Sequence, residues 1–175
     1  YILADYYLRE GKMPEAIEAM KKGVELKQKN SEYLYGMYIL RGQITDVSKE
    51  EAIKYLENAF DYYAVYAANF LGQYYYYAND ENSSVEKAIE WHEKANAYYS
   101  TDSTFELGII YSYNDKVKDE AKGMSYFDLA IEEKNHRAMS EKAYILISEQ
   151  NAGKEKIEEA KKLFENAMEL GNDYA

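Results

Sequence analysis

Small side chains recur along this chain in pairs seven residues apart. The five pairs are Ala16/Gly23, Ala52/Ala59, Ala88/Ala95, Gly123/Ala130 and Ala160/Ala167. Residues at i and i+7 lie on one stripe of an α-helix, and small side chains there let a second helix approach closely. Apolar residues at i+3 and i+4 between the members complete an amphipathic face. The pattern therefore predicts five packed helices.

The pairs return with a nearly constant period. Their first members are separated by 36, 36, 35 and 37 positions. Two further series of mostly small residues run in phase with them: Gly36, Gly72, Gly108 and Ala143, and Ser31, Ala67, Ser103 and Ala138, whose next expected member is Ala175. Self-similarity at such a period indicates a repeat architecture.

Each repeat is expected to contain two antiparallel helices, helix A and helix B. Helix A is predicted at 1–10, 31–42, 64–78, 101–113 and 136–149, and helix B at 14–27, 49–60, 85–97, 119–132 and 155–170. Ser48-x-x-Glu51 and Ser83-x-x-Glu86 match the capping box, and Pro14 suits a first helical position. Sustained alternation typical of strands is absent.

The predicted fold class is therefore all-α, a single array of about five helix-turn-helix repeats. The repeat units are expected at about 1–29, 30–62, 63–99, 100–134 and 135–171. A helical pair this short cannot bury its apolar face alone, so the pairs must stack into a solenoid. The opening Tyr1-Ile2-Leu3 has no initiator Met and suggests a slice of a longer array.

The third unit carries a recognisable motif. The stretch FLGQYYYYANDENSSVEKAIEWHEKA, from Phe70 to Ala95, resembles the Sel-1-like repeat through Leu71-Gly72, Tyr75, Ala88, Trp91 and Ala95. The fourth unit matches through Leu107-Gly108, Tyr111, Gly123, Tyr126 and Ala130, and the second and last units match more weakly. The resemblance implies a right-handed α–α superhelix that acts as a non-catalytic interaction scaffold.

The tetratricopeptide repeat is the close alternative. It has a shorter period of 34 residues and resembles this chain in its helix-turn-helix logic. The loop between helix A and helix B is longer here, as it is in Sel-1-like repeats: Gly36 to Ala52 spans 16 positions. The first unit is an exception, because Ala4 to Ala16 spans the tetratricopeptide-like twelve.

Composition narrows the class of partner. The 21 Lys and Arg against 32 Asp and Glu give a net charge of −11, which repels phosphate backbones and anionic lipid. We therefore expect a neutral to basic protein or peptide partner, no nucleic acid, no membrane insertion and a monomeric fragment. The compartment is left open, since the absence of Cys does not decide it.

Catalytic and metal-binding signals are weak throughout. The two histidines, His92 and His136, lie 44 residues apart and lack metal-ligand spacing, and no nucleophile or phosphate-binding loop accompanies the carboxylates. We expect no enzyme activity, no metal and no cofactor. Trp91 is expected to pack in the core. Asn82-Ser83-Ser84 is a formal glycosylation sequon, although both serines also suit helix caps.

The 21 tyrosines suggest where a partner binds. Tyr38, Tyr55, Tyr75, Tyr111 and Tyr126 fall at or beside core positions of the repeat. Counting from each small residue of helix A selects a second, aromatic and amide-rich column as the concave-face candidates: Tyr33, Arg41, Asn69, Gln73, Tyr76, Tyr77, Phe105, Tyr113 and Tyr144. Aromatic side chains give large contact area at low entropic cost. The hypothesis is a peptide-binding adaptor; the alternatives are a groove for glycan or cell-wall fragments, and a passive regulatory or spacer segment of a larger protein.

Overall fold

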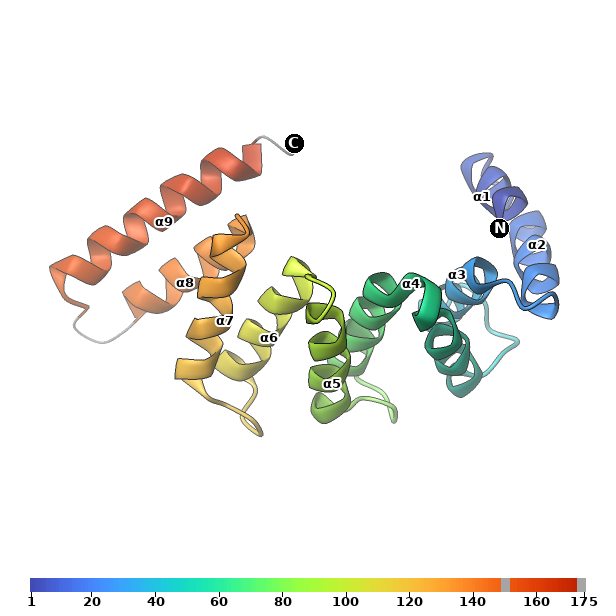
Figure 1. Cartoon of the computed structure of the whole chain (residues 1–175), viewed down its shortest axis with the longest axis horizontal. Helices are drawn as coiled ribbons and strands as arrows, with labels where there is room; N and C mark the ends of the chain where they lie inside the picture. Colours follow the sequence, from blue (N-terminus) through green and yellow to red (C-terminus); the bar gives the residue numbers. More distant parts are fainter. Residues whose placement is uncertain (149–151, 173–175) are drawn as a thin grey trace. The chain divides into compact units, whose positions relative to one another are not determined.

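A computed structural model describes residues 1–148 and 152–172, and every regular element in these ranges is an α-helix. The helices are α1 (Ile2–Arg9), α2 (Met13–Glu25), α3 (Lys29–Leu40), α4 (Lys49–Tyr77), α5 (Val85–Asn96), α6 (Thr101–Tyr113), α7 (Glu120–Glu132), α8 (His136–Ser148) and α9 (Lys154–Asn172) (Figure 1). The all-α prediction is confirmed. The chain forms two compact units, Tyr1–Tyr98 and Tyr99–Ala175, which are described separately below.

Helix starts follow from local capping chemistry. The Ser48 hydroxyl accepts from the Glu51 N–H at 3.2 Å, as its capping box predicts, and Pro14 occupies the first turn of α2. The second predicted box was displaced by one residue. Ser84, not Ser83, caps α5 by accepting from the Lys87 N–H at 3.2 Å, because the Ser83 hydroxyl instead accepts from the Asp80 N–H.

The helix break predicted between 60 and 64 is reduced to one residue. α4 runs from Lys49 to Tyr77 with a single non-helical position, Tyr63, at φ −115° and ψ 41°. The residues one repeat before and after it, Lys27 and Tyr99, have φ values of 54° and 62° and end their helices. Tyr63 keeps a negative φ instead, so helix B kinks directly into the next helix A.

Replacing Lys134 by glycine is expected to raise the free energy of unfolding by about 0.5–1 kcal/mol. Lys134 is exposed and has a φ of 60° at the end of α7, where an L side chain is strained and glycine is not. Urea denaturation followed by circular dichroism measures the change. Lys161→Gly, inside the exposed face of α9, is the matched control, and it should lower stability by a similar amount. A destabilised Lys134→Gly would contradict the argument.

The small residues that define the repeat period lie in helix contacts, as their spacing predicted. All ten members of the five pairs are buried. The glycines of helix A also leave room for one large side chain of the following helix B: a Cβ on Gly36 would lie 3.0 Å from Leu56, one on Gly72 2.7 Å from the His92 ring and one on Gly108 2.6 Å from the Phe127 ring. Leu56, His92 and Phe127 are register equivalents, so one close helix contact is repeated with different occupants. Ala175 lies outside the described residues.

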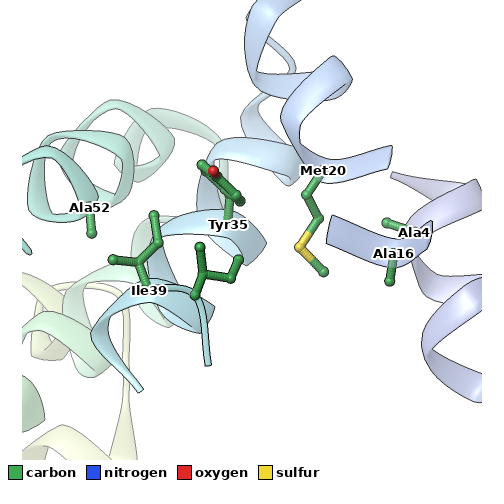
Figure 2. Close-up of a cluster of buried hydrophobic side chains, with 7 residues drawn as sticks. Ala4, Ala16, Met20, Tyr35, Ile39 and Ala52 are labelled. Carbon is green, nitrogen blue, oxygen red and sulfur yellow. The ribbon is translucent and has the colours of Figure 1, made fainter. Parts of the chain in front are cut away.

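Figure 2 shows that the side chain of helix B is packed in the same way in the first repeat. Met20 reaches from α2 into the space between Ala4 and Ala16 on one side and Tyr35 and Ile39 on the other. Met20 is fully buried and takes the position that Leu56 takes one repeat later. The first repeat therefore packs like the others, although its loop is shorter.

Candidate functional site

Three of the six candidate site residues in the unit Tyr1–Tyr98 lie together between α3 and the second half of α4. Arg41, Gln73 and Tyr77 line one pocket of about 310 Å³. The Arg41 guanidinium lies 5.4 Å from the centre of the Phe70 ring, within cation–π range. The remaining lining residues are Leu40, Lys49, Tyr74, Ala78 and Asp80. We call this the α3–α4 pocket.

An ion pair closes one side of the α3–α4 pocket. The Lys49 ammonium lies 2.6 Å from the Asp80 carboxylate, to which the Tyr74 hydroxyl also donates at 2.9 Å. Burial opposes ionisation of Asp80, but the hydrogen bonds from Lys49 and Tyr74 outweigh it and hold the pKa of that carboxyl below its usual range. Burial and the same bond raise the pKa of Tyr74. This side of the pocket is thus a fixed, neutralised pair.

The second unit has a pocket of about 220 Å³ that contains two more candidates, Tyr113 and Tyr144. It lies where α6, α7 and α8 meet. Its other lining residues are Ser112, Lys118, Glu120, Met124, Ile145 and Ser148. The Tyr113 hydroxyl donates to the Glu141 carboxylate; burial first, and this bond second, raise the pKa of Tyr113. We call this the α6–α8 pocket.

The two pockets occupy the same positions of the repeat. Counted from the small residues of their own repeats, six lining positions correspond: Leu40 with Ser112, Arg41 with Tyr113, Lys49 with Glu120, Gln73 with Tyr144, Tyr74 with Ile145, and Tyr77 with Ser148. Each pocket thus lies between the C-terminal turns of helices A from consecutive repeats. These six positions are shared, whereas the other lining residues of the two pockets come from different positions of the repeat.

The remaining candidates lie outside these pockets. Tyr33 is half-buried and its ring stacks on Tyr63, with centroids 5.3 Å apart and planes 18° apart. Asn69 and Tyr76 are also half-buried. Phe105 is a core residue and not part of the predicted surface: it is 5% exposed, packs on Phe127 and is covered by the Arg137 guanidinium. Its position in α6 resembles that of Tyr33 in α3, but a neighbouring arginine covers it.

Comparison with known protein families finds a repeat family that matches the chain. The pattern of the Sel1 repeat matches residues 30–61, 65–97 and 101–135, which together make up more than half of the sequence. The chain belongs to the Sel1 repeat family. Proteins built from Sel1 repeats are commonly protein–protein interaction scaffolds, and this helical repeat fold is generally non-catalytic. The match does not include the first and last of the five predicted repeats, where the sequence motif is weakest.

Solved structures share the Sel1 repeat fold. A Sel1 repeat protein from Oxalobacter formigenes aligns with a TM-score of 0.71 and 22% identity, over 95% of this chain and 70% of that one. The protective antigen c5321 of uropathogenic Escherichia coli strains, which displays an SLR fold, aligns with a TM-score of 0.69 and 20% identity, over 90% of this chain and 34% of that one.

A third structure, the immunity protein Pa5087 from Pseudomonas aeruginosa, aligns with a TM-score of 0.54 and 18% identity, over 90% of this chain and 58% of that one. None of the curated proteins compared with the chain matches it. At these identities the likeness to the three structures shows the fold of this Sel1 repeat chain alone.

Other candidate chemistry in this Sel1 repeat chain has structural explanations. Trp91 is 7% exposed and meets Phe60 edge-on, as a packing residue should. The Asn82 amide donates to Glu50 at 3.3 Å, and Ser84 of its sequon caps α5. Among the described residues, no three His, Asp or Glu side chains gather as metal ligands, and none of the helices has the length and apolar character of a membrane span.

Counting along helix A missed one wall of each Sel1 repeat pocket. Lys49 and Glu120 are the first residues of their helices, and Asp80 and Lys118 come from loops that join a helix A to the following helix B. A usable signal existed, because Lys49 and Glu120 each precede the first small residue of helix B by three positions. The path of the loops, by contrast, has no periodic signal.

Proposed function

We propose that this chain is a scaffold that binds an extended protein or peptide segment on the helix A side of its repeats. The proposal rests on one observation: each unit has a pocket between consecutive helices A, and the two pockets are lined from corresponding repeat positions. Together they contain five of the nine candidate residues. Those five are Arg41, Gln73, Tyr77, Tyr113 and Tyr144. An extended segment presents separate side chains, and each pocket can receive one of them.

The chemistry of the two pockets supports a peptide ligand. Tyr77 and Tyr144 are each 57% exposed, and Tyr113 is 45% exposed, although aromatic rings are usually more buried than this. Exposed tyrosines bind with much apolar area and few rotatable bonds, while Gln73 supplies amide groups for backbone contacts. The outer faces of the B helices instead carry intrahelical ion pairs such as Lys94–Glu90, which hold solvent.

A defined peptide library tests the proposal. The chain is immobilised and probed with a displayed random dodecapeptide library, and the enriched peptides are resynthesised and titrated by fluorescence anisotropy. We expect the double variant Tyr77→Ala, Tyr144→Ala to weaken binding of these peptides by about tenfold or more, because each ring is a contact anchor. Its melting temperature should change by no more than about 2 °C, since both side chains are exposed.

Tyr99→Ala is the matched control. Tyr99 is 95% exposed and lies in neither pocket, so its removal should leave peptide affinity unchanged. Failure of every peptide to enrich, or equal binding by the double variant, would contradict the proposal. A parallel titration with cell-wall oligosaccharides distinguishes the alternative: saturable sugar binding lost in the double variant, without peptide binding, would identify a glycan groove.

A further inference from the structure

The α6–α8 pocket combines an apolar sheath with uncompensated negative charge. Its walls are the rings of Tyr113 and Tyr144 and the side chains of Met124 and Ile145. The Lys118 ammonium lies 2.9 Å from Glu120, so these two charges cancel. Glu141 accepts a hydrogen bond from Tyr113, yet among the described residues it takes part in no ion pair within 4.0 Å. One carboxylate, hydrogen-bonded to a tyrosine that lines the pocket, is therefore left without a cation.

Helix ends add to this negative potential. Tyr113 and Ser148, the last residues of α6 and α8, both line the pocket. The C-terminus of a helix carries a partial negative charge because its last carbonyl groups lack intrahelical partners. A cation in this pocket would meet favourable potential from the helix ends and from Glu141, within a chain whose net charge is −11.

The α3–α4 pocket provides an internal template for such a cation. At the position equivalent to Tyr113 it has Arg41, whose guanidinium lies over Phe70, and Phe70 is the register equivalent of Glu141. The second cation, Lys49, replaces Glu120. One pocket thus contains an arginine of this chain near two helix C-termini, while the other is lined from the same repeat positions and has no arginine.

We propose that the α6–α8 pocket binds an arginine side chain of the partner. The methylene stem of the arginine lies along Met124 and Ile145, its guanidinium stacks on the exposed tyrosine rings, and its N–H groups donate to the Glu141 carboxylate. Arginine suits this site better than lysine, because a planar guanidinium can stack and pair with a carboxylate at once. The inference rests on the proposed function and names the side chain that one pocket selects.

The test uses small probes on the intact chain. Nα-acetyl-arginine amide, the corresponding lysine amide and the uncharged citrulline amide are each titrated into ¹⁵N-labelled protein, and amide chemical shifts are followed. We expect saturable shifts at residues of the α6–α8 pocket with the arginine probe, weaker binding of the lysine probe, and a loss of about tenfold or more with citrulline, which keeps the shape but not the charge.

A matched pair of variants locates the charge. Glu141→Gln should weaken the arginine probe to the level of citrulline, whereas Glu165→Gln, an identical change on the exposed face of α9, should have no effect. Equal binding of arginine and citrulline, or shifts that Glu141→Gln leaves intact, would overturn the inference. Peptides that bind through the tyrosines without any arginine preference would leave the proposed function standing while refuting this one.

Discussion

Lowering the pH from 7 to 4 is expected to cost about 3 kcal/mol of unfolding free energy through His92 alone. The side chain is fully buried against the backbone of Gly72. Burial disfavours the charged imidazolium and lowers the pKa of His92 from 6.5 to about 4. Since one pKa unit corresponds to about 1.4 kcal/mol, this difference sets the size of the effect.

The sign follows from proton uptake. Well above pH 6.5 the imidazole is neutral in both the folded and the unfolded chain, so its protonation costs no stability there. Between pH 6.5 and pH 4 the unfolded chain binds a proton that the folded chain does not, and stability falls as the pH falls. Urea titrations followed by the fluorescence of Trp91, the only tryptophan and the neighbour of His92, measure the loss in this part of the chain.

His92→Phe provides the control, because phenylalanine already occupies the equivalent position as Phe127 and fits against a helix A glycine there. This variant should fold and show a nearly flat dependence between pH 6.5 and 4.5. Carboxylates with lowered pKa values, such as Asp46 and Asp80, lose their contributions at lower pH. An unchanged slope in His92→Phe would show that other groups cause the decline.

Gly108→Ala is expected to destabilise the chain by about 1–3 kcal/mol, although alanine is the better helix former. A Cβ at this position would lie 2.6 Å from the ring of Phe127, which is fully buried and cannot retreat without moving α7. The last repeat illustrates the conflict: Ala143 stands at the glycine position, and the equivalent Phe164 is only half-buried. Chemical denaturation followed by circular dichroism measures the cost.

Two variants isolate the steric contact. Gly171→Ala, whose added Cβ would meet its nearest side chain at an ordinary 3.9 Å, should be neutral or stabilising. In the Phe127→Leu background, Gly108→Ala should cost less than in the parent chain, because the smaller side chain can shift; the coupling between the two sites is expected to be about 0.5–3 kcal/mol. Additive effects would show that the two side chains do not compete for the same space.

Most of the fold could be predicted from the repeat period of the sequence. Helix packing requires small residues at fixed intervals, so Ala52, Ala59 and their equivalents could be assigned to contacts before any coordinates, and all proved buried. The capping residues predicted the helix starts almost as well, but two neighbouring residues can suit the same cap. Ser83 and Ser84 both suit a cap, and only the hydrogen bond from Asp80 to Ser83 selected Ser84.

The candidate surface was less predictable, because exposure depends on neighbours in other helices. Tyr33 and Phe105 hold equivalent positions, yet Arg137, one repeat beyond Phe105, covers the phenylalanine and completes its burial. The loops similarly bring Asp80 and Lys118 to the pockets, at positions without periodic spacing. Contacts of this kind join residues about 30 positions apart, and no local pattern encodes them.

The sequence by itself therefore determined an all-helical array with a 36-residue period, the approximate bounds of its helices and the identity of its close helix contacts. These properties depend on the spacing of residues within one segment of the chain. Because an α-helix has 3.6 residues per turn, that spacing shows which residues share a face. Only the tertiary structure decided that Arg41, Gln73 and Tyr77 share one pocket, and that Tyr113 and Tyr144 share its register equivalent. Pockets arise where side chains from separate helices and loops leave space, and that space depends on how all of those segments pack.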